Sequence, residues 1–343
     1  MRKQQVMMMN NGKMIAVWGN KGSGKTTTAV KLAVRLAAMK KEVIVVLTEI
    51  TAPDINVLLP FARDINTMGN LWATPDCSME AIYKACNSTN SNYLGILAYK
   101  SGENVFSYPD YTKDNIMDIF MKLKNMADYI IVDCVDVFAY NVLTTVALEL
   151  ADKVIRMGEA TTKAFSFFDS NLPLLQDSRY KSGQHYKVLA KVKSYQAKDA
   201  TVSQYGSINA ELPYVEELEH QTLEGELFKQ LDTKVMKGYN IGLERILTFI
   251  IDEGSEENEM IKISEKKEVK KKRENMKGLI PFMGRREKKD DRIATKKALQ
   301  EKRTVKEKNS LKKSNGNERK LSKYSESKKD KKTFFRLKGK EVS

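Results

Sequence analysis

The chain is poor in the residues that build disulfide and zinc scaffolds. Its 343 residues include three cysteines and two histidines. Cys77, Cys86 and Cys134 are odd in number and lack metal-ligand spacing, which argues against a disulfide framework. Two histidines in all argue equally against a structural zinc site.

The sequence also lacks a long uninterrupted hydrophobic run. The apolar stretch near the N-terminus, within MRKQQVMMMNNGK, is too short for a signal peptide. The most apolar segment, residues 129–150, contains Asp133 and Asp136, so we expect it to lie in a protein core and not in a bilayer. We therefore expect a cytoplasmic protein unless a partner recruits it to a membrane or to the nucleoid.

Positive charge is abundant but unevenly placed. The net charge is +15, yet residues 254–343 alone hold 31 Lys and Arg against 15 Asp and Glu, which leaves residues 1–253 close to neutral. With few apolar residues, the last 90 residues cannot offset the entropy of folding, which predicts a largely disordered, lysine-rich tail. We accordingly expect a flexible N-terminus over 1–12, a folded domain over 13–253 and this tail over 254–343.

Residues 19–27, GNKGSGKTT, match the phosphate-loop pattern G-x-x-x-x-G-K-[ST]. An apolar run suited to a strand (14–18) precedes them, and apolar residues at helical spacing follow, which is the context the motif requires. Lys25 is expected to reach the β- and γ-phosphates, and the Thr26 hydroxyl to help hold Mg²⁺. We expect the nucleotide to contact Gly19, Asn20, Lys21, Gly22, Ser23, Gly24, Lys25, Thr26 and Thr27.

Apolar runs alternate with helical segments through the rest of the domain. Solidly apolar runs such as EVIVVL and YIIVD indicate strands covered by helices on both faces. The order predicts an α/β fold with a mostly parallel sheet. Strands are expected at 13–18, 42–47, 94–99, 129–133, 153–157, 186–192 and 208–212, and helices at 26–39, 79–86, 113–126, 142–150, 161–175, 215–230 and 240–251.

Two acidic residues follow these strands and are candidates for the chemistry. Asp133 closes the run YIIVD, where a carboxylate beside the phosphate loop can hold Mg²⁺; a simple capping aspartate is the alternative. Glu49 follows the second strand, where it could orient an attacking water, but a surface-loop acid fits the sequence equally well. Asp54 is a weaker candidate for the same role.

Together these residues resemble the ParA/MinD branch of P-loop ATPases over about residues 13–250. The resemblance rests on GNKGSGKTTTAVKLA, on EVIVVLTE, on DYIIVD and on INAELP followed by VEEL. Within the branch the chain looks most like pilus-associated, CpaE/TadZ-like members. The resemblance implies ATP and Mg²⁺ as cofactors, an ATP-dependent homodimer, and binding of DNA, membrane or a protein partner.

The chain departs from the family pattern in the residues that act on the nucleotide. Asn20 stands where the family places its signature lysine, and the lysine comes one residue later as Lys21, the candidate for contact across a dimer. The segment after Asp133 lacks the glycine whose N–H would contact the γ-phosphate, and Ala190 or Lys191 replaces a base-reading asparagine. With Lys25, Glu49 and Lys21 as the catalytic candidates, we expect slow or partner-dependent hydrolysis.

Four functions follow as hypotheses. The first is a nucleotide-dependent switch that positions or assembles a larger machinery, of pilus, secretion or mobile-element type. The second is a DNA-partition ATPase whose basic residues, within 262–340, bind DNA without sequence preference; these residues could instead contact an anionic membrane or simply maintain solubility. The third is a degenerate nucleotide-binding scaffold with little hydrolysis. A bacterial P-loop tyrosine kinase ranks last, because the tail holds only Tyr324.

Overall fold

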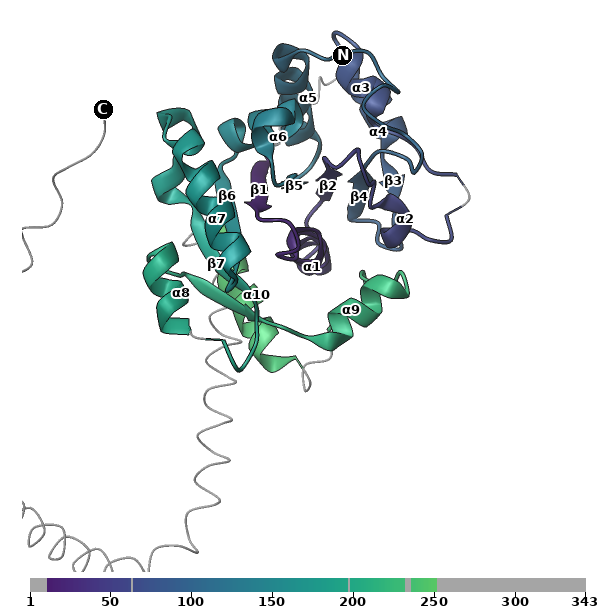
Figure 1. Ribbon diagram of the computed structural model, residues 1–343. Helices are drawn as coiled ribbons and strands as arrows, with labels where there is room; N and C mark the ends of the chain where they lie inside the picture. Colours follow the sequence, from purple (N-terminus) through teal and green to yellow (C-terminus); the bar gives the residue numbers. More distant parts are fainter. Residues whose placement is uncertain (1–10, 63, 197, 232–235, 252–343) are drawn as a thin grey trace, which may run out of the picture. The chain divides into compact units, whose positions relative to one another are not determined.

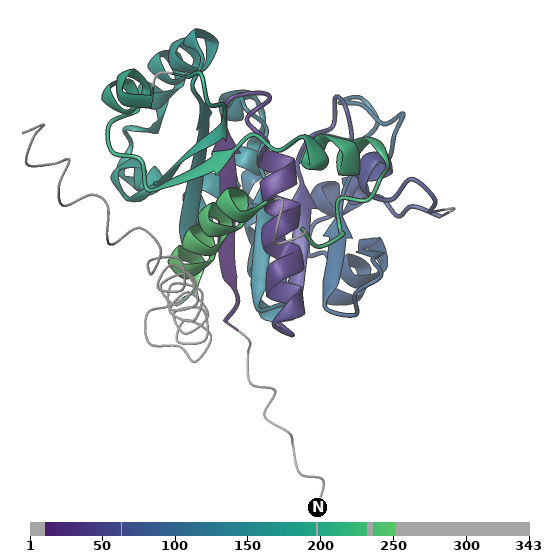
Figure 2. The same cartoon turned by 90° about the horizontal axis from the view of Figure 1, so that it is seen from below.

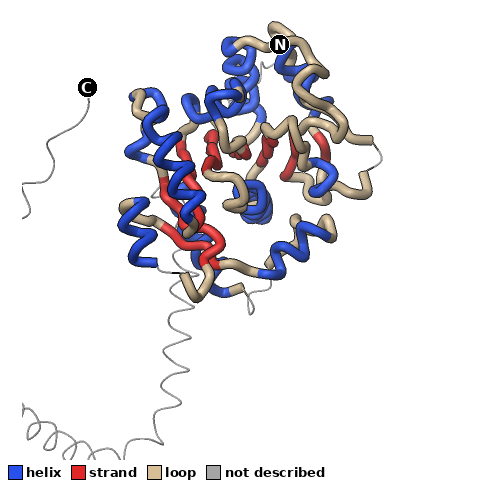
Figure 3. Tube along the Cα trace, in the orientation of Figure 1, coloured by secondary structure: helices blue, strands red, loops and turns tan. Residues whose placement is uncertain are grey.

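A mostly parallel β-sheet runs through the part of the chain that the computed structural model describes, residues 11–62, 64–196, 198–231 and 236–251. Its strands lie in the order β3-β4-β2-β5-β1-β6-β7-β8. Figure 1 labels most of these strands, and Figure 3 shows the strands in red with helices on both sides of them. Every neighbouring pair is parallel except β3 with β4. The strands are β1 Lys13–Gly19, β2 Val43–Leu47, β3 Asn87–Ser88, β4 Leu94–Leu97, β5 Tyr129–Asp133, β6 Lys153–Glu159, β7 Tyr186–Val192 and β8 Ala210–Pro213.

Helices cover both faces of this sheet, which confirms the predicted fold class. Within the described residues, α1, α2, α9 and α10 contribute to the core on one face, and α3 to α7 to the core on the other. Figure 2 shows α1 and α10 in front of the sheet. The α-helices are α1 Lys25–Ala38, α2 Ile55–Leu58, α3 Gly69–Ala73, α4 Met79–Ala85, α5 Lys113–Met126, α6 Val142–Leu150, α7 Thr162–Asn171, α8 Lys198–Tyr205, α9 Glu216–Leu223 and α10 Lys237–Ile250.

The central strands are solidly apolar because neither of their faces meets water. Every residue of β2 and of β5 is buried, as expected for parallel strands sandwiched between helices. The helices begin where the sequence supplies a cap: the side chains of Ser78, Thr112, Asn141 and Thr161 each accept a hydrogen bond from the first turn of α4, α5, α6 and α7. Local sequence and burial therefore agree over most of the domain.

The strand order reverses at β1, which lies between β5 and β6. From β1 the chain crosses through α1 to β2 on one side, whereas β6, β7 and β8 extend the sheet on the other. A crevice forms outside the carboxyl ends of the strands where the order of an α/β sheet reverses. The loop that follows β1 is placed at this crevice.

Some elements differ from the sequence-based expectations. The helix expected over 215–230 ends at Leu223, because Gly225 follows with a φ of 69°, a left-handed conformation that stops helices. The helix expected over 161–175 ends at Asn171 and continues as a 3₁₀ turn. The short helices α2 and α3 and the helix α8 were not predicted.

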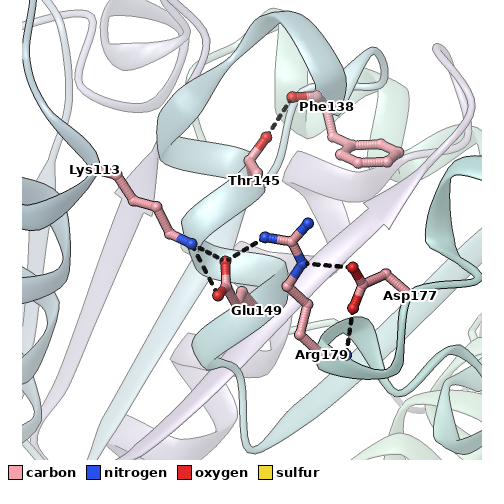
Figure 4. Close-up of polar contacts among 6 residues, drawn as sticks. All are labelled: Lys113, Phe138, Thr145, Glu149, Asp177 and Arg179. Atoms are coloured by element: carbon pink, nitrogen blue, oxygen red, sulfur yellow. Dashed lines mark hydrogen bonds and ion pairs between the residues drawn. The ribbon is translucent and has the colours of Figure 1, made fainter.

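Polar contacts fix α6 to its neighbours (Figure 4). The Glu149 carboxylate pairs with Lys113 of α5 at 2.7 Å and lies 3.9 Å from Arg179. At the other end of α6, the Thr145 hydroxyl donates to the Phe138 carbonyl at 2.8 Å. The segment after β5 is thereby attached to a helix that is itself held on two sides.

No helix among the described residues is long and apolar enough to cross a membrane. The apolar segment 129–150 forms β5, a 3₁₀ turn and α6, and it lies mostly in the core. Residues 1–10 of the predicted N-terminal segment and the whole predicted tail, 254–343, lie outside the described residues.

Candidate functional site

The loop between β1 and α1, residues 19–27, is shaped by glycine at both ends. A Cβ on Gly19 would lie 1.8 Å from the carbonyl oxygen of Met157 in β6, so only glycine fits where the loop leaves the sheet. Gly24, at the N-cap of α1, has a φ of 79°, which also favours glycine. Backbone N–H groups at the N-terminus of a helix form a site for phosphate.

Asn20 organises this loop from inside. It is buried, and its carbonyl oxygen accepts hydrogen bonds from the Ser23 hydroxyl at 2.8 Å and from Lys25 Nζ at 3.2 Å. Its side-chain amide lies 3.4 Å from a carboxylate oxygen of Glu159 at the end of β6. Lys21 is exposed. Asn20 thus holds the loop together, and the contact of Lys21 across a dimer stays a prediction.

Thr26 meets two carboxylates at the start of α1. Its hydroxyl donates to Asp133 Oδ2 at 2.6 Å, and Asp54 Oδ2 lies 3.4 Å from the same hydroxyl. Asp133 comes from the carboxyl end of β5, next to β1, and Asp54 is the N-cap residue of α2. The structure thus brings together the two predicted metal-binding residues, Thr26 and Asp133, and adds Asp54.

Burial dominates the electrostatics of these acids. Desolvation raises the pKa of Asp133 to about 7, although the Thr26 hydrogen bond and the Lys25 charge act in the opposite direction. Burial, followed by the charge of Glu49, also raises the pKa of Asp54. Asp133 Oδ1 is buried without a hydrogen-bond partner. A nearby divalent cation would satisfy this oxygen and restore the charged form.

The described residues do not complete a metal site by themselves. No group of three His, Cys, Asp or Glu side chains within them has the arrangement of a metal centre. Mg²⁺ commonly takes one or two carboxylates and completes its octahedron with phosphate oxygens and water. The residues around Thr26 therefore fit Mg²⁺ that arrives with a nucleotide.

Glu49 makes a local contact outside this group. The backbone N–H of Thr51 donates to Glu49 Oε1 at 2.7 Å. Glu49 is near enough to the site to affect the pKa of Asp54 and of Asp133. Its role in orienting water stays a prediction, and Asp54 is the acid of this segment that contacts Thr26.

Side chains from three elements hold the segment that follows β5. The N–H of Val135 donates to the hydroxyls of Thr48 at 3.1 Å and Thr144 at 3.2 Å. One residue further, the Asp136 carbonyl accepts the indole N–H of Trp18 at 2.9 Å. The backbone that would have to turn toward a γ-phosphate is thus already engaged by β1, by the end of β2 and by α6.

A cavity of about 350 Å³ lies beside the phosphate loop. This volume is within the usual range of small-molecule sites, and most of the lining is apolar, as a base and ribose require. The lining residues come from the loop and α1, from β6 to β8, and from α9 and α10: Ser23, Gly24, Thr27, Thr28, Met157, Ala190, Lys191, Leu212, Pro213, Tyr214, Val215, Leu218, Glu219, Thr222, Leu223 and Tyr239.

Buried Lys31 attaches α9, one wall of this cavity, to α1. Its ammonium donates to Gln221 Oε1 at 2.6 Å and to the carbonyls of Leu227 and Lys229 at 2.7 Å each. Burial lowers the pKa of Lys31 to about 8. The phosphate-loop helix and α9 are therefore joined through one side chain.

The chain just after α9 contacts the segment after α2. A Cβ on Gly225 would lie 2.2 Å from Cγ of Pro60. The segment that begins at Asp54 and the chain around α9 are consequently in contact with each other.

The sequence interpretation missed the contacts of Lys31 and Asp54. The pattern of residues 26–37 could have predicted the contacts of Lys31, because it places this lysine among the apolar residues of the helix, and a lysine is rarely buried without partners. Asp54 carried no local pattern that separates it from a loop acid. Lys191, named only as a replacement for a base-reading residue, lines the cavity and lies over the loop.

The sheet order, the glycine loop and the Thr26–Asp133 pair together define a P-loop nucleotide-binding fold of the MinD and ParA type. No family model matches the sequence, and no curated protein matches it. The comparison with solved structures, by contrast, returns MinD, McdA and ParA-family ATPases.

The similarity to these structures covers about two thirds of this chain. The Pyrococcus horikoshii septum site-determining protein MinD, complexed with Mg-ADP, superimposes with a TM-score of 0.55 at 18% identity over 68% of this chain and 96% of its own. A ParA-family ATPase from Chlorobium tepidum gives 0.57 at 15% identity over 68% and 98%. The Aquifex aeolicus MinC:MinD complex gives 0.56 at 18% identity over 71% and 99%. At these identities the comparisons establish the fold.

Proposed function

We propose that this chain is a Mg²⁺-dependent, ATP-binding and slowly hydrolysing ATPase that acts as a nucleotide-dependent switch. The observation that carries the proposal is the contact between Thr26 and Asp133 at the head of the phosphate loop, with Asp133 Oδ1 left without a partner. Structural neighbours have been crystallised with Mg-ADP and with ATP. Both the loop and the adjoining cavity suit such a nucleotide.

Each residue has a distinct part in this proposal. The backbone N–H groups of residues 22–27 would hold the phosphates, and Lys25 would leave the Asn20 carbonyl for the β- and γ-phosphates. Thr26 and Asp133 would hold Mg²⁺, directly or through water, and the metal would neutralise charge on the phosphate oxygens. Glu49 or Asp54 would orient the attacking water.

Slow hydrolysis follows from the segment after Asp133. The Val135 N–H already has two hydroxyl acceptors, and Trp18 holds the next carbonyl. Contact with a γ-phosphate would break these buried hydrogen bonds, each worth about 0.5–1.5 kcal/mol. A partner that rearranges this segment would therefore accelerate turnover.

The same edge of the sheet suits an ATP-dependent homodimer. Lys21 is exposed beside the nucleotide site, and Val137 and Tyr140, in the segment that follows β5, are 40% and 92% exposed. Exposed apolar and aromatic side chains are typical of surfaces that bind another protein. A MinD structure in complex with MinC shows that a protein of this fold also binds a separate protein.

The process we propose is the positioning or assembly of a larger machinery, of pilus, secretion or mobile-element type, with CpaE/TadZ-like proteins as the model. The protein would act in the cytoplasm and be recruited to membrane or nucleoid through residues 262–340. Clusters of lysine and arginine bind anionic lipid and nucleic acid alike, and the apolar residues 278–283 favour membrane or protein contact.

Two alternatives remain alongside this process. A partition ATPase would use the basic residues after 253 for non-specific DNA binding; a structural neighbour is described as a putative plasmid partition protein. A degenerate nucleotide-binding scaffold is favoured by the engaged Val135 N–H, which would stay fixed in every nucleotide state.

Steady-state ATP turnover separates these hypotheses. We would measure it for the full chain and for a chain ending at Glu253, each with and without duplex DNA, with Lys25→Ala as the inactive control. Slow, DNA-independent turnover in both chains supports the switch. DNA stimulation of the full chain alone supports partition, and bound nucleotide with no turnover supports the scaffold. Absence of nucleotide binding by the full chain contradicts all three.

A further inference from the structure

Lys191 occupies a strained position beside the phosphate loop. It lies in β7 where the pairing with β8 is irregular, between Leu189 and Val192. Its φ of 51° is in the left-handed region, which a lysine adopts only with backbone strain. Irregular pairing next to a functional site commonly redirects a side chain.

The irregularity sends Lys191 to the face of the sheet that carries α1. Val188 and Ala190 pack in the core on that face, so regular alternation would send the next side chain to the opposite face. Instead, Lys191 Cε lies 3.8 Å from the position of a Cβ on Gly24, and Lys191 lines the 350 Å³ cavity. The strained backbone thus delivers an aliphatic stem and an ammonium to the N-terminus of α1.

This ammonium has no counter-charge in the described part of the chain. No carboxylate there lies within ion-pair distance of Lys191, and its side chain makes no hydrogen bond. The acids that flank the cavity have other contacts: Glu219 accepts from the Tyr214 hydroxyl at 2.9 Å, and Glu159 lies 3.4 Å from the Asn20 amide. A second cation, Lys25, opens α1 at the end of the phosphate loop.

We propose that Lys191 binds the phosphate nearest the ribose of a nucleotide held in its own chain. The inference rests on the proposed nucleotide binding. The base and ribose would lie in the apolar part of the cavity against Leu212 and Leu218, and the terminal phosphates in the loop. The phosphate between them passes Gly24, where Lys191 lies. A charge-assisted hydrogen bond there would offset the strain of its backbone.

Isothermal titration of the full chain with ATP, ADP, AMP and adenosine tests this assignment, because AMP carries only the phosphate nearest the ribose. Lys191→Gln removes the charge, and we expect it to weaken the binding of ATP, ADP and AMP by the same factor, about tenfold, while adenosine binding stays unchanged. Lys191→Gly also removes the ammonium but can adopt the left-handed φ without strain, so it should show the same weakening of nucleotide binding. Lys193→Gln is the matched control, since the Lys193 ammonium lies over the Tyr214 ring at 4.8 Å, and it should change each affinity less than twofold.

Each other outcome overturns the assignment in a recognisable way. A loss of affinity for ATP alone would place Lys191 on the γ-phosphate, and a loss for ATP and ADP but not for AMP would place it on the β-phosphate. An equal loss of affinity for adenosine would place it on the base or ribose. Unchanged affinities in Lys191→Gln would remove it from the site. If the wild-type chain binds neither ATP nor ADP, the proposed function itself is wrong, which is distinct from a failure of Lys191 alone.

Discussion

Replacing Lys31 by methionine should destabilise the domain although it puts an apolar side chain into an apolar stripe. Lys31 is 2% exposed, and its ammonium satisfies three oxygens on α9 and the segment after it. The methionine would leave two buried acceptors, Gln221 Oε1 and the Leu227 carbonyl, without a partner, and would remove a third, part-buried contact to the Lys229 carbonyl. Each unpaired buried acceptor costs about 1–3 kcal/mol, and removal of a buried charge offsets part of this cost, so we expect a net loss of about 2–4 kcal/mol in the free energy of unfolding.

The stability lost in Lys31→Met should also depend on pH. The pKa of Lys31 in the folded protein is about 8, below its ordinary value of 10.5. Between these values the unfolded chain binds more protons, so the wild-type protein gains stability from this group as pH rises through the window. The gap between wild type and Lys31→Met should therefore widen by up to about 2 kcal/mol from about pH 7 to about pH 9.5.

Chemical denaturation of the full chain at several pH values measures both effects. Lys84→Met is the control, because Lys84 is 71% exposed in its pair with Glu80 and should cost at most about 0.5 kcal/mol. Nucleotide affinity should fall in Lys31→Met as well, since α9 loses its attachment to α1. This reasoning would be refuted if Lys31→Met were as stable as the wild type. It would also be refuted if the difference between their free energies of unfolding narrowed as pH rises.

Three further predictions concern the loop and its surroundings. Asp133→Asn should raise the melting temperature of the nucleotide-free protein near pH 7, because burial raises the pKa of Asp133 to about 7 and the folded protein therefore loses stability as pH rises toward that value. The same variant should lose Mg²⁺-dependent ATP binding. Equal melting curves for the variant and the wild type would contradict the pKa argument. Gly19→Ala should cost more than about 2 kcal/mol in denaturant titration, because its Cβ would overlap the Met157 carbonyl; a loss below 1 kcal/mol would show that β6 yields. Trp18→Phe removes the hydrogen bond to the Asp136 carbonyl and should speed ATP turnover. Unchanged turnover would show that this hydrogen bond does not limit the rate of hydrolysis.

The sequence predicted what depends on neighbouring residues. The phosphate loop was recognisable because glycine, lysine and threonine at fixed spacing follow a strand and open a helix. The buried strands were recognisable because both of their faces are covered. Asp133 was found through the same local logic, at the end of an apolar run beside the expected loop.

Contacts between distant segments could not be read in the same way. Asp54 meets Thr26 only because α2 folds back over the loop, and Lys31 finds its acceptors about 190 residues further along the chain. The backbone of Lys191 depends on the pairing of β7 with β8. Short helices such as α2 and α3 have too few residues to show a period, so tertiary packing determines them.

The contact between Gly225 and Pro60 has a kinetic consequence. The cavity beside the phosphate loop has α9 as one wall, and the chain just beyond α9 touches the segment after α2. In the proposed nucleotide-bound state, outward movement of α9 would therefore have to break this contact. The lifetime of the bound state would then depend on this contact and on the Lys31 hydrogen bonds to α9 and to the residues after it.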